Sequence, residues 1–241
     1  GDRTFQGVSR SIDHFCAVDG KPINMVWLRN GTTFMNTVVQ MVGGLSERGL
    51  REGNPFAAVI PELLAADPDC GGILALPFMD DEPGVGVSRG GTALLVGLNE
   101  QNAKPGNVAR AALLATVFNL RLGCEQLLSQ GFPLEQIVLS GGLTKSPELG
   151  QVLADGFQLP VTILASGSEG SAWGAALMAK YRHRCLNAAT ESWSDFLNDH
   201  ASGTPLRFMP NVNAAAASSD LFAKYKRLLS VQPKLDEAVN A

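Results

Sequence analysis

The chain alternates between short apolar runs and longer segments that mix apolar and polar residues. Short apolar runs bounded by glycine, proline or acidic residues are typical of strands, whereas apolar residues spaced three and four apart are typical of helices. The pattern predicts strands at residues 71–76, 93–98, 137–139 and 160–164. It predicts helices at residues 31–42, 54–66, 105–128, 147–157 and 170–179. Because strands and helices alternate through the middle, we expect an α/β fold with a layered sheet.

Both ends of the chain differ from this middle part. Residues 15–28 are predicted to form a β-hairpin that turns at Asp19-Gly20, which is a strong hairpin signal. After Lys180 the composition changes to alanine, serine and asparagine, with helices predicted at residues 192–198 and 219–229. We expect this last part to be peripheral to the core.

The most informative segment runs from Ile137 to Pro147. Its apolar start predicts a short strand covered on both faces, as in a parallel sheet. Gly141 and Gly142 follow, and because glycine has no side chain, a flat ligand can lie directly against the backbone there. Ser146 before Pro147 is typical of a helix start, with the hydroxyl capping the first free N–H groups. The segment indicates a nucleotide site, although any α/β protein can turn at glycines between a strand and a helix.

Length and composition exclude several classes of protein. A chain of 241 residues, 45% hydrophobic and 17% charged, is ordinary for a soluble globular domain. The net charge of -4 comes without a clustered positive face, so we expect no nucleic-acid partner. No apolar run approaches the roughly 20 residues that span a bilayer, and the first residues lack a signal-peptide core. We therefore expect a cytoplasmic protein without a membrane partner.

Cysteine and histidine are scattered along the chain. No C-x-x-C pair occurs, so we expect reduced thiols and no metal site. These residues are Cys16, Cys70, Cys124, Cys185, His14, His183 and His200.

Several segments, in the same order, resemble the C-terminal half of the FGGY family of carbohydrate kinases. In that family a strand leads to Gly-Gly, a small or basic stretch and Ser/Asn-Pro before a helix, as in residues 137–155. The next strand opens with Pro-Val, like Pro160-Val161, and the last core helix carries Gly-Ala-Ala, like residues 174–176. Further similar segments are residues 13–33, 76–98, 109–128 and 225–229.

The resemblance implies an actin-like ATPase (ribonuclease H-like) domain, an α/β fold in which a mixed sheet is flanked by helices. It implies that residues 1–185 form the C-terminal nucleotide-binding domain and that residues 186–241 form a helical extension packed on it. In this fold the nucleotide and the sugar lie in a cleft between two related halves. The resemblance therefore implies that the N-terminal half of the same protein is missing from this chain.

By resemblance, two walls enclose the adenine and ribose of ATP. One wall comes from the turn after the central strand and the other from the helix after the hairpin. The implied residues are Gly141, Gly142, Leu143 and Ser146 on the first wall, and Gly31, Thr33 and Phe34 on the second. Lys145 is either close to the nucleotide or a solvated side chain at a helix start.

Phosphoryl transfer also needs a phosphate-binding site with Mg²⁺ and a base for the attacking hydroxyl. No Walker A sequence occurs in the chain. In the family, the Gly-Thr-Ser-Gly turn and the catalytic Gly-Asp pair lie upstream of the hairpin, so we expect no catalytic residue and no metal ligand here. Asp81 and Glu82 can be interpreted as a catalytic pair, but a solvated loop or a contact at the cleft mouth is the simpler interpretation.

The resulting expectation is the nucleotide-binding half of an ATP- and Mg²⁺-dependent kinase that phosphorylates a ketopentose or a related sugar, similar to xylulokinase. One alternative is another kinase of the family, such as ribulokinase, gluconokinase or glycerol kinase. Another is a non-catalytic binding or dimerising module of the same fold, and a homodimer is compatible with either. The sugar stays open because only Glu82, Pro83, Arg89 and Gly90 match the family's loop there.

Overall fold

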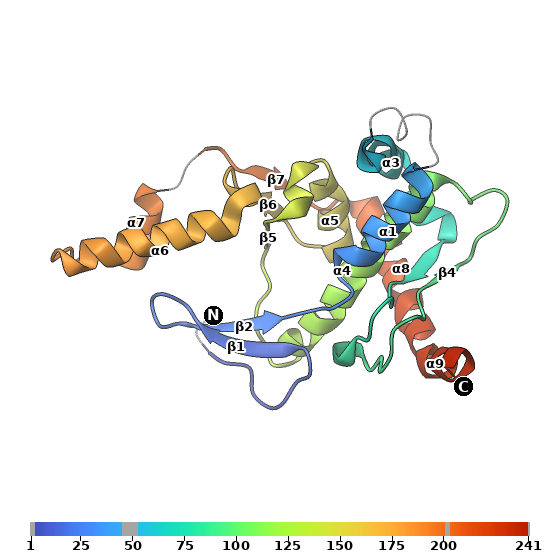
Figure 1. The fold of residues 1–241 in the computed structure, drawn as a ribbon, viewed down its shortest axis with the longest axis horizontal. Helices are drawn as coiled ribbons and strands as arrows, with labels where there is room; N and C mark the ends of the chain where they lie inside the picture. The colour runs from blue at the N-terminus through green and yellow to red at the C-terminus, as the bar shows by residue number, and fades with distance from the viewer. Residues whose placement is uncertain (1–2, 45–52, 201–202, 241) are drawn as a thin grey trace.

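The computed structural model describes residues 3–44, 53–200 and 203–240. The elements at the N-terminal end are β1 (Ile12–Cys16), β2 (Pro22–Val26), α1 (Thr32–Gly43), α3 (Pro55–Ala65), η1 (Cys70–Gly72), β3 (Leu74–Leu76), η2 (Pro83–Val85), β4 (Leu94–Val96) and α4 (Pro105–Ser129). Those that follow are β5 (Ile137–Leu139), η3 (Gly142–Lys145), α5 (Leu149–Phe157), β6 (Val161–Ile163), η4 (Gly167–Glu169), α6 (Gly170–Leu186), α7 (Trp193–Asp199), β7 (Leu206–Phe208), α8 (Val212–Leu229) and α9 (Gln232–Asn240). The hairpin and the helices predicted through the middle of the chain are confirmed (Figure 1).

The described strands form separate small sheets rather than one continuous layer. β1 pairs with β2 and β3 pairs with β4, both antiparallel. The third sheet is mixed, with the order β5-β6-β7, in which β5 and β6 are parallel and β7 is antiparallel to β6. Ile137 lies opposite Val161, and α5 joins the two strands. The predicted parallel strand–helix–strand unit is confirmed.

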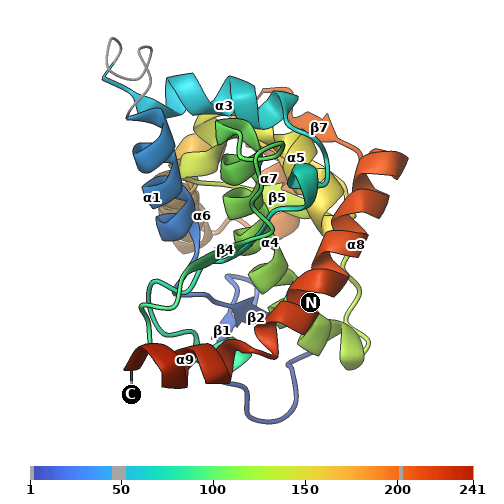
Figure 2. The same ribbon diagram turned by 90° about the vertical axis from the view of Figure 1, so that its right-hand side faces the viewer.

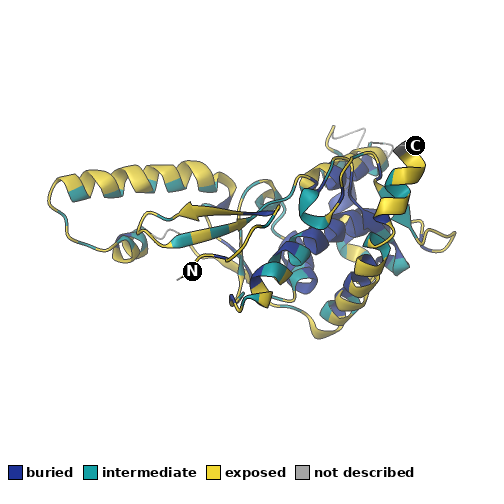
Figure 3. Cartoon of the chain, turned by 90° about the horizontal axis from the view of Figure 1, so that it is seen from below, coloured by how far each residue is buried: buried dark blue, intermediate teal, exposed yellow. Residues whose placement is uncertain are grey.

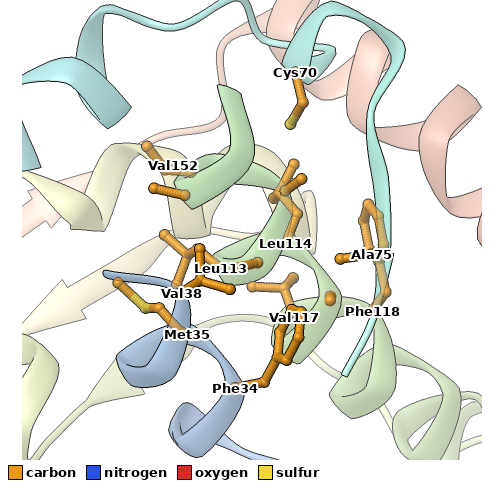
Figure 4. Packing of buried hydrophobic residues seen from close by; sticks show 14 of the residues in the cluster. Phe34, Met35, Val38, Cys70, Ala75, Leu113, Leu114, Val117, Phe118 and Val152 are labelled. Carbon is orange, nitrogen blue, oxygen red and sulfur yellow. The ribbon is translucent and has the colours of Figure 1, made fainter. Parts of the chain in front are cut away.

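The core is built around α4, which runs through the middle of the molecule (Figure 2). α4 contacts α1, α3, α5 and β3. Figure 4 shows Leu113, Leu114 and Val117 of α4 among side chains from α1 and α5. By length and composition α4 could cross a membrane, yet 61% of its most apolar window is buried inside the protein. Its place in the core therefore explains its apolar sequence.

Two elements of the C-terminal part of the chain, β7 and α8, are not peripheral, contrary to the expectation from its composition. β7 adds a strand to the mixed sheet. α8 buries Leu221, Phe222 and Tyr225 in the main core. These residues share one face of the helix because Tyr225 lies four positions after Leu221 and three after Phe222. Because small residues surround these three, the overall composition of the segment does not indicate that this face is buried.

The strand β5 is less covered than its apolar sequence predicts. Val138 is 52% exposed, whereas Ile137 and Leu139 are half-buried. Burial on both faces was therefore a wrong prediction, because neighbouring elements cover only one face of this short strand.

Replacing Tyr225 by phenylalanine should lower the free energy of unfolding by about 1–3 kcal/mol. The buried Tyr225 hydroxyl donates a hydrogen bond of 2.6 Å to Oδ1 of Asn119, which is also buried. Burial raises the pKa of Tyr225 far above its ordinary value, so the hydroxyl stays a neutral donor. The substitution leaves the Asn119 oxygen buried without this donor. Urea unfolding, compared at constant m-value, measures the loss.

The matched control is Tyr181→Phe, in which the lost hydroxyl donates to the Glu191 carbonyl in a less buried place. We expect the control to lower stability by less than about 1 kcal/mol. Equal losses in the two variants would contradict the role given to the Tyr225–Asn119 contact.

Candidate functional site

A pocket of about 820 Å³ opens between α1, α3 and the turn that follows β5. This volume lies within the range of small-molecule sites. Its apolar lining residues are Met35, Phe56, Ala57, Ile60, Pro61, Leu64, Leu143 and Leu149. Its polar or glycine lining residues are Thr32, Asn36, Asn54, Ser140, Gly142, Lys145, Ser146 and Glu148. Apolar walls with a few polar groups suit a flat heterocycle whose edge carries hydrogen-bonding atoms.

The two glycines after β5 have different roles. Gly141 has φ 88° and ψ -155°, a conformation that is essentially restricted to glycine. Its N–H donates to the Gly167 carbonyl at 2.9 Å, and its own carbonyl accepts from the Thr144 hydroxyl at 2.6 Å. Gly141 is therefore needed for the turn itself.

Gly142 leaves an open backbone surface in the pocket. A Cβ atom added there would meet no protein atom within 4 Å, and its φ is not positive. The backbone of Gly142 does not require glycine, so the missing side chain matters only for what occupies the pocket. Gly141 is therefore required by its backbone conformation, whereas Gly142 is not.

The helix that follows the turn begins later than the sequence indicates. Ser146 ends a 3₁₀ turn, and its carbonyl accepts a hydrogen bond from Leu149 N at 3.0 Å. α5 begins at Leu149 with Glu148 as its N-cap residue, and no side chain caps it. The predicted capping role of the Ser146 hydroxyl is wrong, because η3 inserts an extra turn before the helix. Because it caps no helix, the Ser146 side chain is free to line the pocket.

Of the residues implied by resemblance on this wall, Gly142, Leu143 and Ser146 line the pocket, and Gly141 directly precedes them. Lys145 lines it too, as an exposed side chain that forms no ion pair within residues 3–44, 53–200 and 203–240. It is therefore available to an anionic group of a ligand. Contact of these residues with a nucleotide stays a prediction.

On the opposite wall the structure brings neighbours of the implied residues into the pocket. Thr32, Met35 and Asn36 line it, and they share one face of α1 because they lie three and four positions apart. The implied residues Gly31, Thr33 and Phe34 are not among its lining residues.

The three implied residues of this wall have other contacts. Phe34 is 6% exposed and packs in the core, where it lies near Val117 (Figure 4). The Gly31 carbonyl accepts a hydrogen bond of 2.7 Å from the Thr116 hydroxyl, and the Thr33 carbonyl accepts one of 3.0 Å from the Thr37 hydroxyl. Contact of these three residues with a nucleotide also stays a prediction.

A third wall, from α3, was not foreseen. Asn54 caps this helix by accepting a hydrogen bond of 3.1 Å from Phe56 N, and both residues line the pocket. The Asn54-Pro55 start was visible as a helix signal. Nothing in the sequence indicated that this helix faces the double glycine, because their proximity depends on packing over α4.

Glu82 fixes the start of α1, and its surroundings overturn the expectation of a solvated loop. Its side chain is completely buried. It accepts hydrogen bonds from Arg29 N at 3.1 and 3.2 Å, from Asn30 N at 2.9 Å and from Asn30 Nδ2 at 3.2 Å. Asp81 instead pairs with the Arg29 side chain near the surface. The two acids are therefore separate contacts, and Glu82 is a positioning residue for the helix that carries Thr32.

The residues present do not form a metal site of their own. Within residues 3–44, 53–200 and 203–240, no group of three or more His, Cys, Asp or Glu side chains could hold a metal ion. Glu148 is the one acid among the pocket-lining residues that the structure describes. A single carboxylate is a poor match for Mg²⁺, which takes carboxylates together with phosphate oxygens.

Comparison with known proteins places this geometry in a family. Residues 15–183 match the FGGY family of carbohydrate kinases, C-terminal domain. Over 118 residues the chain is 34% identical to a ribulokinase from Mycolicibacterium smegmatis. The aligned segment covers 48% of this chain and 21% of that protein.

Two solved structures have the same fold. A xylulose kinase from Rhodospirillum rubrum matches with a TM-score of 0.74 at 17% identity, over 94% of this chain and 43% of that chain. A glycerol kinase from Plasmodium falciparum with ADP matches with a TM-score of 0.58 at 18% identity, over 80% of this chain and 37% of that chain. The chain thus spans less than half the length of each of these proteins. With the actin-like fold and the match over most of its length, the chain belongs to the FGGY family of carbohydrate kinases and contains its C-terminal domain.

Proposed function

We propose that this chain is the nucleotide-binding half of an ATP-dependent sugar kinase, and that the pocket at Gly142 holds the adenosine. The observation that carries the proposal is the open backbone at Gly142 between the apolar walls of α1 and α3. Membership in a carbohydrate-kinase family supports a nucleotide as the ligand, as does the ADP of the related glycerol kinase.

Each wall has a distinct task in this proposal. The purine lies on the Gly142 backbone, with Met35 and Ile60 excluding water from its other side. Ser146 and Asn36 supply hydroxyl and amide groups for the polar atoms of the nucleoside. Lys145 at the rim attracts the phosphates.

The reaction itself requires groups outside the described residues. Mg²⁺, when bound with ATP, neutralises charge on the phosphates. The pocket does not supply a set of carboxylates for that ion, so we propose that its ligands, the base for the sugar hydroxyl and the sugar contacts belong to the other half of the protein.

We propose a ketopentose or a related polyol as the acceptor, as in xylulokinase. The names of the similar proteins span ribulose, xylulose and glycerol, so a phosphorylation assay of the full-length protein over a panel of these acceptors and gluconate identifies the sugar.

Replacing Gly142 by valine should weaken ATP binding to the full-length protein by at least about tenfold, or roughly 1.4 kcal/mol. A Cβ atom at this position meets no protein atom within 4 Å, and the added side chain occupies the space in which we place the purine. Because φ at Gly142 is not positive, we expect the variant to fold. Calorimetric titration with ATP and Mg²⁺ measures the change at a matched folded fraction.

The matched control is Gly174→Val. A Cβ atom at Gly174 of α6 also meets nothing within 4 Å, yet this glycine does not line the pocket. We expect the control to bind ATP like the wild type. If Gly142→Val folds and binds ATP as tightly as the control, the adenosine does not lie on Gly142.

A further inference from the structure

A second cavity, of about 690 Å³, lies between the end of α3, the side of α4, α5 and the start of α8. It is separate from the proposed nucleotide pocket, with which it shares Leu64 as a lining residue. Its lining includes the side chain of Arg110, which belongs to the buried face of α4.

Arg110 is a buried cation whose donors are mostly unused. The residue is 6% exposed. Its Nη1 donates one long hydrogen bond of 3.4 Å to the Leu63 carbonyl, and its Nε is buried without a partner. Within the described part of the chain Arg110 forms no ion pair. Since a guanidinium carries five N–H donors and a permanent charge, this arrangement leaves it in need of acceptors.

The neighbouring carboxylate does not meet this need. Asp155 is 5% exposed and lines the same cavity. Its Oδ1 accepts from Gln151 Nε2 at 2.9 Å and from Asn211 N at 2.7 Å, so neutral donors already satisfy this oxygen. Burial lowers the pKa of Arg110, and the charges of Asp155 and Asp67 offset this effect only in part. The third neighbouring group, the Cys70 thiol, is neutral because burial raises its pKa to about 12.

The rim of the cavity offers further donors. Asn211 and Asn213 at the start of α8 line it, and both residues are exposed. The Oδ1 of Asn211 caps α8 by accepting from Asn213 N and Ala214 N. Neither side-chain NH₂ group has a partner among the described residues, so both can donate to a ligand.

We propose that this cavity binds a small oxyanion, a carboxylate or a phosphate group, through the guanidinium of Arg110, with the amide of Asn213 at the rim. A planar guanidinium matches the paired oxygens of these anions, and the attraction is strong where water is excluded. A monoanion fits best, because Asp155 and Asp67 already place negative charge near the site.

The test is calorimetric titration of the intact protein with sodium phosphate and with sodium acetate, each measured against sodium chloride at equal ionic strength. We expect millimolar binding of at least one of the two oxyanions and none of chloride. Binding of both assigns the site to oxyanions in general, and binding of one identifies the preferred group. Arg110→Met should weaken the binding at least tenfold.

Because Arg110 is buried, a second variant keeps the test decisive if Arg110→Met does not fold. Asn213→Asp adds a negative charge at the exposed rim, in the first turn of α8, where an acid suits the helix dipole. We expect this variant to fold and to bind the oxyanion at least threefold more weakly. Gly142→Val should bind it like the wild type, which separates this site from the nucleotide pocket. Binding no stronger than that of chloride, or unchanged affinity in Asn213→Asp, would overturn the proposal.

Discussion

Replacing Glu82 by alanine should lower the free energy of unfolding by about 3 kcal/mol or more. The substitution removes the acceptor of two backbone N–H groups, that of the buried Asn30 and that of Arg29, whose bond to Glu82 is partly buried. Each buried donor left without a partner destabilises the protein by about 1–3 kcal/mol. The Asn30 amide keeps its bonds to the Asp80 and Asp81 carbonyls, so it adds little to the loss.

The same variant should weaken nucleotide binding in the fraction that stays folded. Asn30 lies two residues before α1, whose Thr32, Met35 and Asn36 line the pocket. Urea unfolding gives the stability, and ATP titration at a matched folded fraction gives the affinity.

Asp81→Ala is the matched control for Glu82→Ala. Asp81 is the adjacent acid, but it pairs with the Arg29 side chain, which is 48% exposed. Exposed ion pairs contribute little, so we expect a loss below about 1 kcal/mol. If Glu82→Ala were no more destabilising than Asp81→Ala, the buried carboxylate would not be what holds the start of α1.

The 241 residues on their own should bind ATP no more tightly than the millimolar range, about -4 kcal/mol, and should show no phosphotransfer. In the proposed arrangement the pocket holds one end of the nucleotide and offers the phosphates only Lys145, so they remain largely in water without most of the charge-assisted hydrogen bonds that normally hold them. Because we propose that the base and the sugar contacts belong to the other half of the protein, we expect no group here to orient and deprotonate a sugar hydroxyl. The full-length protein should bind ATP more tightly and should transfer phosphate to its sugar.

Calorimetry with ATP and Mg²⁺ measures the affinity, and a coupled ADP-release assay across several ketoses measures turnover. The full-length protein under the same conditions is the positive control. Micromolar binding or sugar-dependent ADP release by the 241 residues alone would contradict the proposal. It would show that this half contains the catalytic elements that we assign to the other half.

The sequence indicated those parts of the fold that depend on neighbouring residues. Asp19-Gly20 sets the hairpin turn, Asn54-Pro55 starts α3, and the segment from Ile137 to Val161 forms its parallel pair. In each of these the signal and the structure lie within a few residues of one another, or are joined by a single helix. The separate sheets and the buried face of α8 depend instead on contacts between distant segments, which no local pattern contains.

The same distinction between local signals and contacts of distant segments applies to the candidate site. Gly142, Leu143 and Ser146 line the pocket because they belong to one turn, which the double glycine made visible. Met35 and Ile60 come from helices whose rotation about their axes is set by packing on α4. An amphipathic pattern also fails to reveal a buried acid such as Glu82, because it lies in a loop of charged and glycine residues that looks solvated.

The unpaired edge of β5 affects how this polypeptide behaves in solution. Only β6 pairs with β5 among the described residues, which leaves a row of backbone donors and acceptors along its other edge. On the hairpin, Phe15, Ile23 and Met25 are 53%, 44% and 39% exposed. Figure 3 shows this hairpin and α6 as largely exposed segments away from the core. Unpaired edges and exposed apolar faces are templates for intermolecular β-pairing, so dilute, freshly prepared samples suit work on this polypeptide in isolation.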